Sequence, residues 1–462
     1  MQILFLLFSI FYALLAWRNL ALALGVLLFA LPAYQIRLRL GFLPTNVLEI
    51  MVLAVFATWL IKAIFNKKLP LANYLFFGSK LKDKNFSPYP FGKEIALLLT
   101  IAFLATMTAG FSSASLGILK AYFIEPVMFF IVFINIFKKQ ANRLYVFWPL
   151  SLSALMVSAI AVYQKISGQL WPVAWADSDR VTGVFAYPNA LGLYLGPIIF
   201  VLAGYLLYLI KIKKAFFWPK IILFLSVVMS IATVFLAKSE GALIGMVVVL
   251  ILSVLLCGQK SRKFTVGFLF ILCVIISLNV SWREPLVKKI ALMDTDGQIR
   301  RQLWSETWQM LNSGYFITGA GLANYQNAIK PFHHSGIYVR NDDPEFDKWV
   351  AISLEYQQQV WQPLEIYLYP HNIFLNFWTE LGLAGMLLFV WLVIKFFVIS
   401  AQTLNSTNHD ARRWLSIALI GAMTLIIIHG LVDAPYFKND LAIIFWLLLG
   451  MVGIYRMEEI KN

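Results

Sequence analysis

The segment YPHNIFLNFWTELGLAG, residues 369–385, places a histidine and an asparagine directly behind a proline and in front of an apolar run. Imidazole titrates near neutral pH and can accept a proton as a general base, so His371 is the candidate base of this chain. A structural hydrogen bond at a helix end is the competing interpretation. Glu380 lies ~13.5 Å further along a helix and on its opposite face, so we expect it to join two helices.

Arginine side chains stand in two further segments. Arg180 opens DRVTGVFAYPNALGLYLGP, and Arg300 and Arg301 open RRQLWSETWQML. A guanidinium group binds phosphate oxygens through a planar, bidentate fork. Arg180 can therefore hold an anion at the membrane surface. Alternatively, its segment is an ordinary helix entry with Asn189 as the cap.

A short polar turn, Lys238-Ser239-Glu240, separates two apolar stretches in LAKSEGALIGM. A turn this short needs polar residues in any case. Its charges, including that of Lys238, nevertheless face the same side as Arg180.

Two other patterns do not define a ligand site. His429 and Asp433 are four residues apart and share a helix face, but two residues without a third ligand do not make a metal site. The glycine-rich run GAGLANY, 319–325, lacks the lysine, the preceding strand and the acidic partner of a nucleotide-binding motif.

The composition requires that these residues be positioned by membrane helices. The chain has 462 residues, of which 60% are hydrophobic and only 13% charged, and its mean hydropathy is +0.76. A soluble protein carries charge on about a quarter of its residues. Apolar stretches long enough to cross a bilayer recur along the chain. We predict twelve or thirteen spans, near 1–16, 19–36, 46–65, 94–111, 115–137, 142–164, 185–210, 219–237, 240–257, 264–280, 371–400, 412–432 and 438–456.

The net charge of +15 is best interpreted as membrane orientation and not as nucleic-acid binding. Lysine and arginine concentrate in short loops between spans, and contact with anionic lipids is the second interpretation. The positive-inside rule makes these basic loops cytoplasmic. It places 165–184 and 281–370 outside. The basic positions are Lys67, Lys68, Lys80, Lys82, Lys84, Lys138, Lys139, Arg143, Lys211, Lys213, Lys214, Lys260, Arg262 and Lys263.

The domain organisation follows from the same pattern. We predict N-terminal transmembrane helices over 1–280, an extracytoplasmic helical loop over 281–370 and C-terminal transmembrane helices over 371–462. The middle segment is polar, rich in aromatic residues and too long for a simple connection, so it is expected to be functional. Trp304 and Trp308 share one helix face there. A second amphipathic stretch ends at Pro370, and together they predict a small helical cap on the outer membrane surface.

These motifs, in this order, resemble one family. An arginine precedes TGxFxxPNxLG, a polar turn follows, then an arginine ahead of a tryptophan and GxGxxxY, then HNxxLxxxxELGxxG and finally GLxDxPxxKND. The pattern is similar to that of the O-antigen ligase superfamily, which also contains O-antigen polymerases and bacterial protein O-oligosaccharyltransferases. The resemblance runs from about 179 to 446, and the histidine motif is its most specific part.

The resemblance implies an all-α, GT-C-type membrane glycosyltransferase of the bacterial inner membrane with a large periplasmic loop. Such enzymes take an oligo- or polysaccharide from undecaprenyl diphosphate and move it to a hydroxyl of a lipid, glycan or protein acceptor. The active site lies on the extracytoplasmic side. The resemblance implies no metal, no nucleotide sugar, no other cofactor and no nucleic-acid partner.

The resemblance also assigns roles to individual residues. The family histidine corresponds to His371, and the arginines near the donor diphosphate correspond to Arg180 and Arg300, with Arg301 as the neighbour that remains open. The residues in supporting positions are Asn189, Asn372, Glu380 and Asp433. A single displacement with His371 as base inverts the anomeric centre.

One position departs from the family, which often has Ser-Arg-Gly at the polar turn. Here the turn reads Ser239-Glu240-Gly241, so an acid replaces a cation expected to touch phosphate. Lys238, directly before it, is the residue expected to supply that charge.

Two competing functions remain at this level. The first is a polymerase that extends the same glycan, which loop composition does not separate from a ligase. The second is a transporter of a lipid or solute. A transporter is expected to show inverted repeats and charged residues deep in its spans. In this sequence the charges gather at one surface instead.

Overall fold

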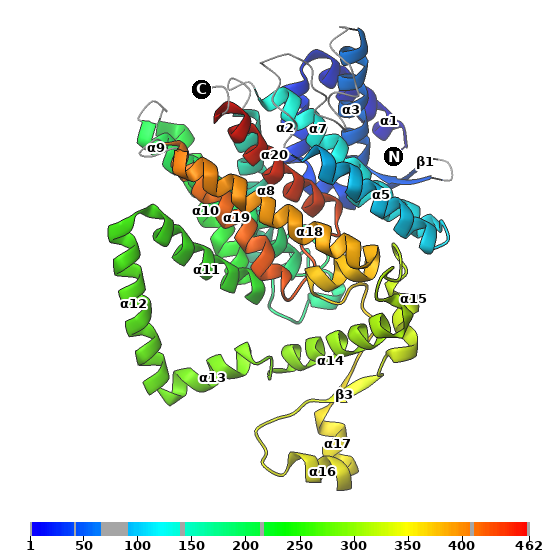
Figure 1. The fold of residues 1–462 in the computed structure, drawn as a ribbon, viewed down its shortest axis with the longest axis vertical. Helices are drawn as coiled ribbons and strands as arrows, with labels where there is room; N and C mark the ends of the chain where they lie inside the picture. The colour runs from blue at the N-terminus through cyan, green and yellow to red at the C-terminus, as the bar shows by residue number, and fades with distance from the viewer. Residues whose placement is uncertain are drawn as a thin grey trace.

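The computed structural model describes residues 2–40, 43–65, 91–138, 144–212, 217–406 and 411–459. Within these ranges the protein is a bundle of long helices with a smaller group of helices and strands hanging from one end (Figure 1). Several positions of the predicted cytoplasmic loops lie outside the described residues, namely Lys67, Lys68, Lys80, Lys82, Lys84, Lys139, Arg143, Lys213 and Lys214.

The bundle is formed by both halves of the chain. Its N-terminal helices are α1 (Gln2–Arg18), α2 (Leu20–Phe29), α3 (Val47–Phe65), α5 (Gly92–Thr108), α6 (Ser113–Ile118), α7 (Glu125–Phe137), α8 (Leu144–Ser167), α9 (Asn189–Ile212), α10 (Phe217–Leu236), α11 (Glu240–Cys257) and α12 (Gln259–Leu278). Its C-terminal helices are α18 (Ile373–Ser406), α19 (Arg412–Gly430) and α20 (Asn439–Glu459). A π-helical turn, Leu119–Ile124, joins α6 to α7.

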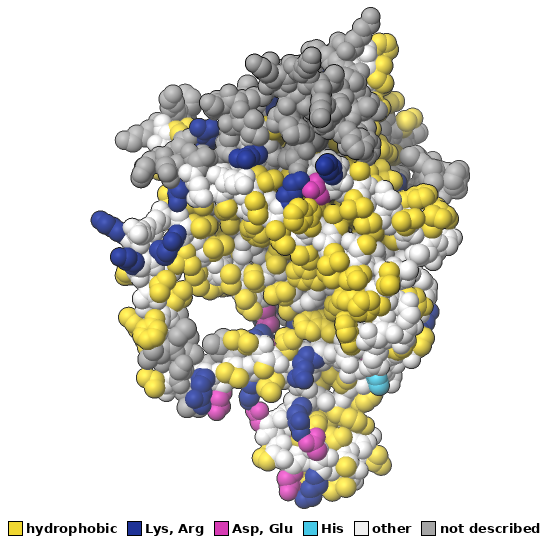
Figure 2. Space-filling view, in the orientation of Figure 1, with side chains coloured by type: hydrophobic (Ala, Val, Ile, Leu, Met, Phe, Trp, Pro, Cys, Tyr) yellow, Lys and Arg dark blue, Asp and Glu magenta, His cyan; other side chains and the backbone are white. Residues whose placement is uncertain are grey.

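The predicted membrane class is confirmed. Nine helices among the described residues are long and apolar enough to cross a bilayer. The other predicted spans coincide with α1, α2, α5 and α12, which are 17, 10, 17 and 20 residues long. The first three are short, and α12 begins with three cations. Figure 2 shows the resulting belt of hydrophobic side chains across the molecule.

The core of the bundle surrounds α20. Trp446 on this helix is fully buried, and its indole packs edge-on against Phe130 of α7. Next to it, α19 packs against α9 and α11, and α18 packs against α5, α19 and α20. The N-termini of α9 and α20 and the C-terminus of α19 therefore meet at the end of the bundle from which the cap hangs (Figure 1).

The cap consists of short elements between α12 and α18. They are α13 (Val280–Ile290), α14 (Thr295–Met310), α15 (Tyr325–Ile329), β3 (Gly336–Tyr338), α16 (Phe346–Ile352), α17 (Leu354–Val360) and β4 (Trp361–Pro363). Helix α14 covers the first predicted helical stretch, and Asp294 caps it by accepting a hydrogen bond from the backbone N–H of Gly297. The second amphipathic stretch breaks into α16, α17 and β4, because Ser353 caps a new helix and Pro363 ends the strand.

Two short antiparallel two-stranded sheets were not predicted from the sequence. One pairs β1 (Arg37–Leu40) with β2 (Leu43–Asn46), and the other pairs β3 with β4. Tyr338 faces Trp361 across the β3–β4 sheet, although 22 residues of chain, including α16 and α17, separate them. Strands of three or four residues carry too short a pattern to be recognised without their partners.

The predicted orientation can be tested by labelling. We expect Gln358→Cys, on the exposed surface of α17, to react with a membrane-impermeant thiol reagent in intact cells, after Cys257 and Cys273 have been changed to serine. Lys211→Cys, at the far end of α9, is the matched control and is expected to react only after lysis. The reverse labelling pattern would overturn the orientation.

Candidate functional site

A cavity of about 580 Å³ lies between the cap and the end of the bundle. Arg180, Arg300 and His371, which come from three separate segments, all line it. Its wall also contains Asn189 at the start of α9, Asp433 in the loop after α19, and the stretch 365–369 that leads to His371. Helix packing thus brings the principal sequence-predicted residues to one concave surface of the size usual for a ligand site.

The backbone at His371 is held in an unusual conformation. Its φ is 47°, in the left-handed region that non-glycine residues rarely adopt. The Oδ1 atom of the next residue, Asn372, accepts hydrogen bonds from the N–H groups of Phe374 and Leu375 at 3.0 and 3.1 Å, so Asn372 caps α18. Its Nδ2 donates to the carbonyl of Leu431 at 3.1 Å. The asparagine therefore fixes the turn that presents the imidazole.

The imidazole of His371 faces a carboxylate. Its Nδ1 lies 3.6 Å from Oδ1 of Asp433. Burial by itself would raise the pKa of Asp433, but the neighbouring imidazoles of His371 and His429 and the N–H of Ala434 lower it to about 2. Asp433 is therefore ionised at neutral pH. A carboxylate at Nδ1 directs the proton of a neutral imidazole to that nitrogen, which leaves Nε2 as the acceptor.

Arg180 is fixed by backbone and side-chain acceptors. Its Nε donates to the carbonyl of Ala237 at 3.0 Å, and its Nη2 donates to Oδ1 of Asn189 at 2.8 Å and to the carbonyl of Lys238 at 3.3 Å. Trp175 lies under the guanidinium, 5.5 Å from ring centre to Cζ. The side chain of Asn189 thus orients the guanidinium of Arg180, and carbonyl oxygens of the polar turn before α11 accept its other hydrogen bonds.

Arg300 reaches the cavity from α14. Among the described residues it makes no hydrogen bond or ion pair, so its guanidinium is available to an anion. Burial lowers the pKa of Arg180, the carboxylates of Asp296 and Glu240 raise it, and the charge of Arg300 lowers it again. The two arginines are thus close enough to influence each other. Arg301 is exposed on the neighbouring face of the helix.

Trp304 connects Arg300 to the histidine turn. It follows Arg300 by four residues and therefore shares its helix face. Its Nε1 donates to the carbonyl of Pro370, directly before His371, at 2.9 Å. From the sequence, Trp304 was recognised as part of an apolar helix face and as the tryptophan that follows the arginine of the family pattern, but its hydrogen bond to the histidine turn was not predicted. Its spacing from Arg300 was the available signal for this role.

Three other wall residues were not predicted. Asp296 lines the cavity from the first turn of α14, Tyr367 packs its ring edge-on against His371 at 5.1 Å, and Trp175 supports Arg180. An acid in the first turn of a helix is common and carries no site information by itself. The two aromatic residues are recognisable only from the fold.

Lys238 and Arg301 do not line this cavity within the described part of the chain. Lys238 adopts a φ of 49°, which turns its carbonyl toward Arg180, while its Nζ lies 3.5 Å from Oδ2 of Asp179 in a solvent-exposed pair. The lysine therefore contributes to the site through its backbone and not through its charge.

Glu380 joins the cap to α18. Its carboxylate is buried, and Oε2 accepts a hydrogen bond from the N–H of Ala323 at 2.7 Å. Beside it, Gly382 has a φ of 74° and lies directly against the carbonyl of Ile317, where a side chain would collide. The run GAGLANY thus forms a strap that docks on α18. Glu380 connects a helix to this strap, not one helix to another.

The unusual acid of the polar turn has a partner in the cap. Glu240 forms an ion pair with Lys289 at the end of α13, and the same Nζ lies 3.2 Å from Oδ2 of Asp294, the cap residue of α14. Partial burial alone would lower the pKa of Lys289, but these two carboxylates raise it overall. The turn that holds Arg180 is thereby linked to the helix that carries Arg300.

This link gives a testable expectation. Lys289→Met is expected to lower the catalytic efficiency of the site about two- to fivefold, because an exposed ion pair is worth less than ~1 kcal/mol. Lys289→Arg, which keeps a positive charge beside both carboxylates, should retain most of it. Lys288→Met is the matched control, since it breaks only the 2.6 Å pair with Asp342. An equal effect of both methionine variants would contradict a specific role for Lys289.

Comparison with known families bears on the central part of the chain. Residues 225–390 match the model of a family described as O-antigen ligase. The matched range includes the polar turn, the cap and the turn at His371, and it leaves out Arg180 and Asp433. The chain matches none of the curated proteins with which it was compared.

Proposed function

Because residues 225–390 form an O-antigen ligase family domain in a multi-pass membrane protein, we propose that the protein transfers a glycan from a polyprenyl-diphosphate carrier to an acceptor hydroxyl. The carrier is undecaprenyl diphosphate, and transfer takes place at the outer face of the bacterial inner membrane. The observation that carries the proposal is the meeting of one imidazole and two guanidinium groups on a single cavity wall.

The reaction needs a base for the acceptor. His371 Nε2 takes the proton of the acceptor hydroxyl while its oxygen attacks the anomeric carbon of the first sugar. The bond between that carbon and the diphosphate oxygen breaks, and the electron pair leaves with the diphosphate. Asp433, 3.6 Å from Nδ1, stabilises the imidazolium that forms. One displacement on the face opposite the leaving group inverts the anomeric centre.

The leaving group needs positive charge. Arg180 is oriented before the donor arrives, since three acceptors and an indole ring hold it. Arg300 approaches from the cap and has no competing partner among the described residues. Cations fixed in advance at the position where negative charge develops often lower the activation barrier more than any other group in an active site. The diphosphate departs as an anion, so no separate acid is required.

The position of the cavity suits a lipid-borne donor. Asn189 lies at the first residue of α9, and Asp433 lies between the last residue of α19 and the first of α20. The reactive groups therefore lie at the ends of membrane-spanning helices, near the depth of lipid head groups. A polyprenyl chain can remain in the bilayer while its diphosphate enters the cavity.

Purified protein in nanodiscs provides the direct test. Incubation with polyprenyl-diphosphate-linked glycan and the cell's own acceptor fraction should yield a glycosylated acceptor and free polyprenyl diphosphate. Absence of both products from well-folded protein with every acceptor fraction would overturn the proposal.

Ligation and chain extension use the same chemistry, because both deliver a glycan to a hydroxyl. The glycan profile of a deletion strain separates them. Full-length glycan that remains on the carrier indicates lost ligation, whereas accumulation of single repeat units indicates lost extension.

A further inference from the structure

On the basis of this proposed function, we propose that the two-stranded β3–β4 sheet of the cap is a binding platform for the donor's glycan chain, centred on Trp361 and Tyr338. These residues lie outside the cavity, and nothing in the reaction described above uses them. The ligand they would take is an oligosaccharide of the donor, bound several sugars away from the diphosphate.

The size of the cavity leaves most of a long glycan outside it. A volume of about 580 Å³ accommodates a drug-sized ligand. A diphosphate with the first sugars fills that space. A longer glycan must leave the cavity and lie along the protein surface or move freely in solvent. Binding energy gained by the chain outside the cavity would offset the entropy lost when the reacting sugar is positioned.

The platform is built from an aromatic pair on a glycine. The indole of Trp361 lies against Gly336, where any Cβ would collide with its ring. The phenol of Tyr338 meets the indole edge-on at 5.0 Å. Even so, Trp361 is 41% and Tyr338 38% exposed. One indole face is thus supported by the backbone while aromatic surface stays open to solvent. The C–H groups of a sugar ring are attracted to the electron-rich face of such rings.

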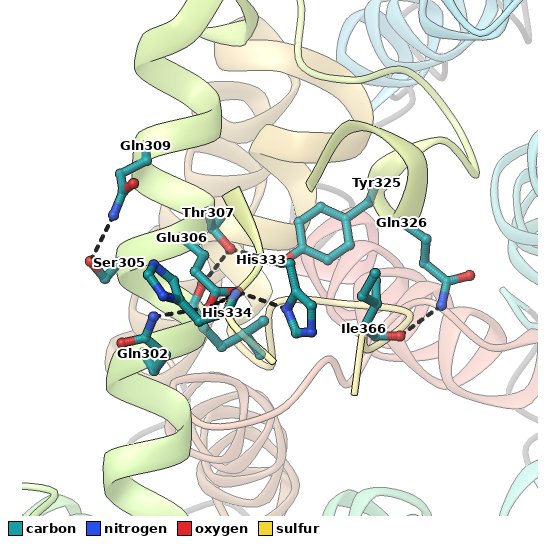
Figure 3. Close-up of polar contacts among 11 residues, drawn as sticks. Gln302, Ser305, Glu306, Thr307, Gln309, Tyr325, Gln326, His333, His334 and Ile366 are labelled. Carbon is teal, nitrogen blue, oxygen red and sulfur yellow. Dashed lines mark hydrogen bonds and ion pairs between the residues drawn. The ribbon is translucent and has the colours of Figure 1, made fainter. Parts of the chain in front are cut away.

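The β3–β4 sheet is held by hydrogen bonds just before β3 and just after β4 (Figure 3). On the β3 side, the buried carboxylate of Glu306 accepts hydrogen bonds from the N–H of His334 at 3.0 Å and from Gln302 at 2.9 Å, and it pairs with His333 at 3.2 Å. On the β4 side, Gln326 donates to the carbonyl of Ile366 at 2.9 Å. These contacts keep the platform in one place relative to the cavity.

Two connections place the platform on the donor side of the cavity. Gln298 of α14 exchanges hydrogen bonds with the backbone of Arg340, at 2.8 Å through Oε1 and 2.9 Å through Nε2. Gln298 lies two residues before Arg300, and Arg340 lies two residues after Tyr338. The distal end of β3 is therefore tied to the helix turn that faces the diphosphate.

The second connection is the chain itself. Strand β4 ends at Pro363, and the cavity wall begins at Glu365. At ~3.3 Å per residue, Trp361 lies no more than ~13 Å along the chain from that wall. A glycan that leaves the diphosphate site past this wall reaches the aromatic pair within a few sugars.

The test compares two donors on purified protein in nanodiscs. One is the polyprenyl-diphosphate donor with its full glycan, and the other is the same donor trimmed to its first sugars. For Trp361→Ala we expect KM for the full donor to rise about tenfold, as for loss of one aromatic anchor, with kcat unchanged. KM for the trimmed donor should not change. Trp361→Phe keeps a ring on Gly336 and should retain most of the affinity.

Trp349→Ala is the matched control. Trp349 is also an exposed tryptophan of the cap, 37% exposed, but it lies on α16 and its ring is covered by Lys348 at 5.1 Å. We expect no change in KM for either donor. An equal rise in KM for both donors in Trp361→Ala, or no rise at all, would overturn the platform. A defect seen only in whole cells would point to a protein partner and would also overturn it.

A binding measurement separates this proposal from the proposed function. The probe is the oligosaccharide released from the carrier by mild acid, observed by saturation-transfer NMR with the complete protein. Wild type and Trp349→Ala should show transfer to the sugar protons, and Trp361→Ala should show little. Failure of glycan transfer with intact oligosaccharide binding would refute the catalytic proposal alone. Absence of binding to the wild type would refute the platform.

Discussion

His371→Ala will lower glycan transfer by about 10²–10⁴-fold, the loss expected when a general base is removed. The imidazole lines the cavity, and its Nδ1 already faces Asp433, which leaves Nε2 to accept the proton of the acceptor hydroxyl. The decisive measurement is the rate of acceptor glycosylation by purified protein at saturating donor. Donor binding should change little, because the arginines remain.

His334→Ala is the matched control for this prediction. His334 also lies in the cap but is exposed, and it contacts Glu306 through its backbone N–H, which the substitution keeps. The variant should transfer glycan at the wild-type rate. If a well-folded His371→Ala protein retains near-normal transfer, His371 has a structural role and the mechanism proposed above fails.

Arg300→Lys will reduce the kcat/KM of transfer by about 10²-fold. Lysine keeps the charge but replaces a planar fork by a single ammonium group, which cannot bind two diphosphate oxygens in parallel. Arg300 has no hydrogen bond or ion pair with another described residue, so the substitution should leave the stability of the fold within about 0.5 kcal/mol. Transfer kinetics with varied donor concentration measure the first effect, and thermal unfolding measures the second.

Arg301→Lys answers the question that the sequence left open. The two arginines are adjacent, but only Arg300 lines the cavity within the described residues. Arg301→Lys should therefore retain transfer within about twofold, as expected for a surface substitution. If Arg301→Lys abolishes transfer and Arg300→Lys does not, α14 presents a different face to the donor and the arrangement of the diphosphate site is wrong.

The membrane architecture was predictable from the sequence alone. Backbone N–H and C=O groups have no water to bind in the hydrocarbon layer, so an apolar stretch of sufficient length must form a helix. Each predicted span accordingly coincides with a helix, from α1 to α20. The kink of α18 at Gly382 was not predicted, because it depends on the strap that approaches the helix from the cap.

The residue types of the candidate site were also visible in the sequence. The imidazole of His371 and the guanidinium of Arg180 stand near the ends of apolar stretches, and Arg300 stands in the polar segment between them, so each is expected by position to be exposed to an extracytoplasmic substrate. The family resemblance predicted that Arg180, Arg300 and His371 share one site, whereas the residues alone did not decide which charged groups meet. Arg301 stayed open beside Arg300, and Lys238 was expected to supply its charge, although neither lines the cavity among the described residues. Asp296 and Tyr367, which do line it, were overlooked.

What the sequence determined is local: hydropathy, helix length, and the kinds of reactive side chain at each helix end. What the tertiary structure decided is the set of neighbours. Arg180 is held by carbonyls 57 and 58 residues away, and Trp304 bonds a carbonyl 66 residues away. The physical reason is that a hydrogen bond within a helix joins residues four apart, whereas the walls of a cavity are formed by the packing of distant helices. In the same packing, the carbonyl of Lys238 points toward Arg180, whereas its ammonium group points toward Asp179.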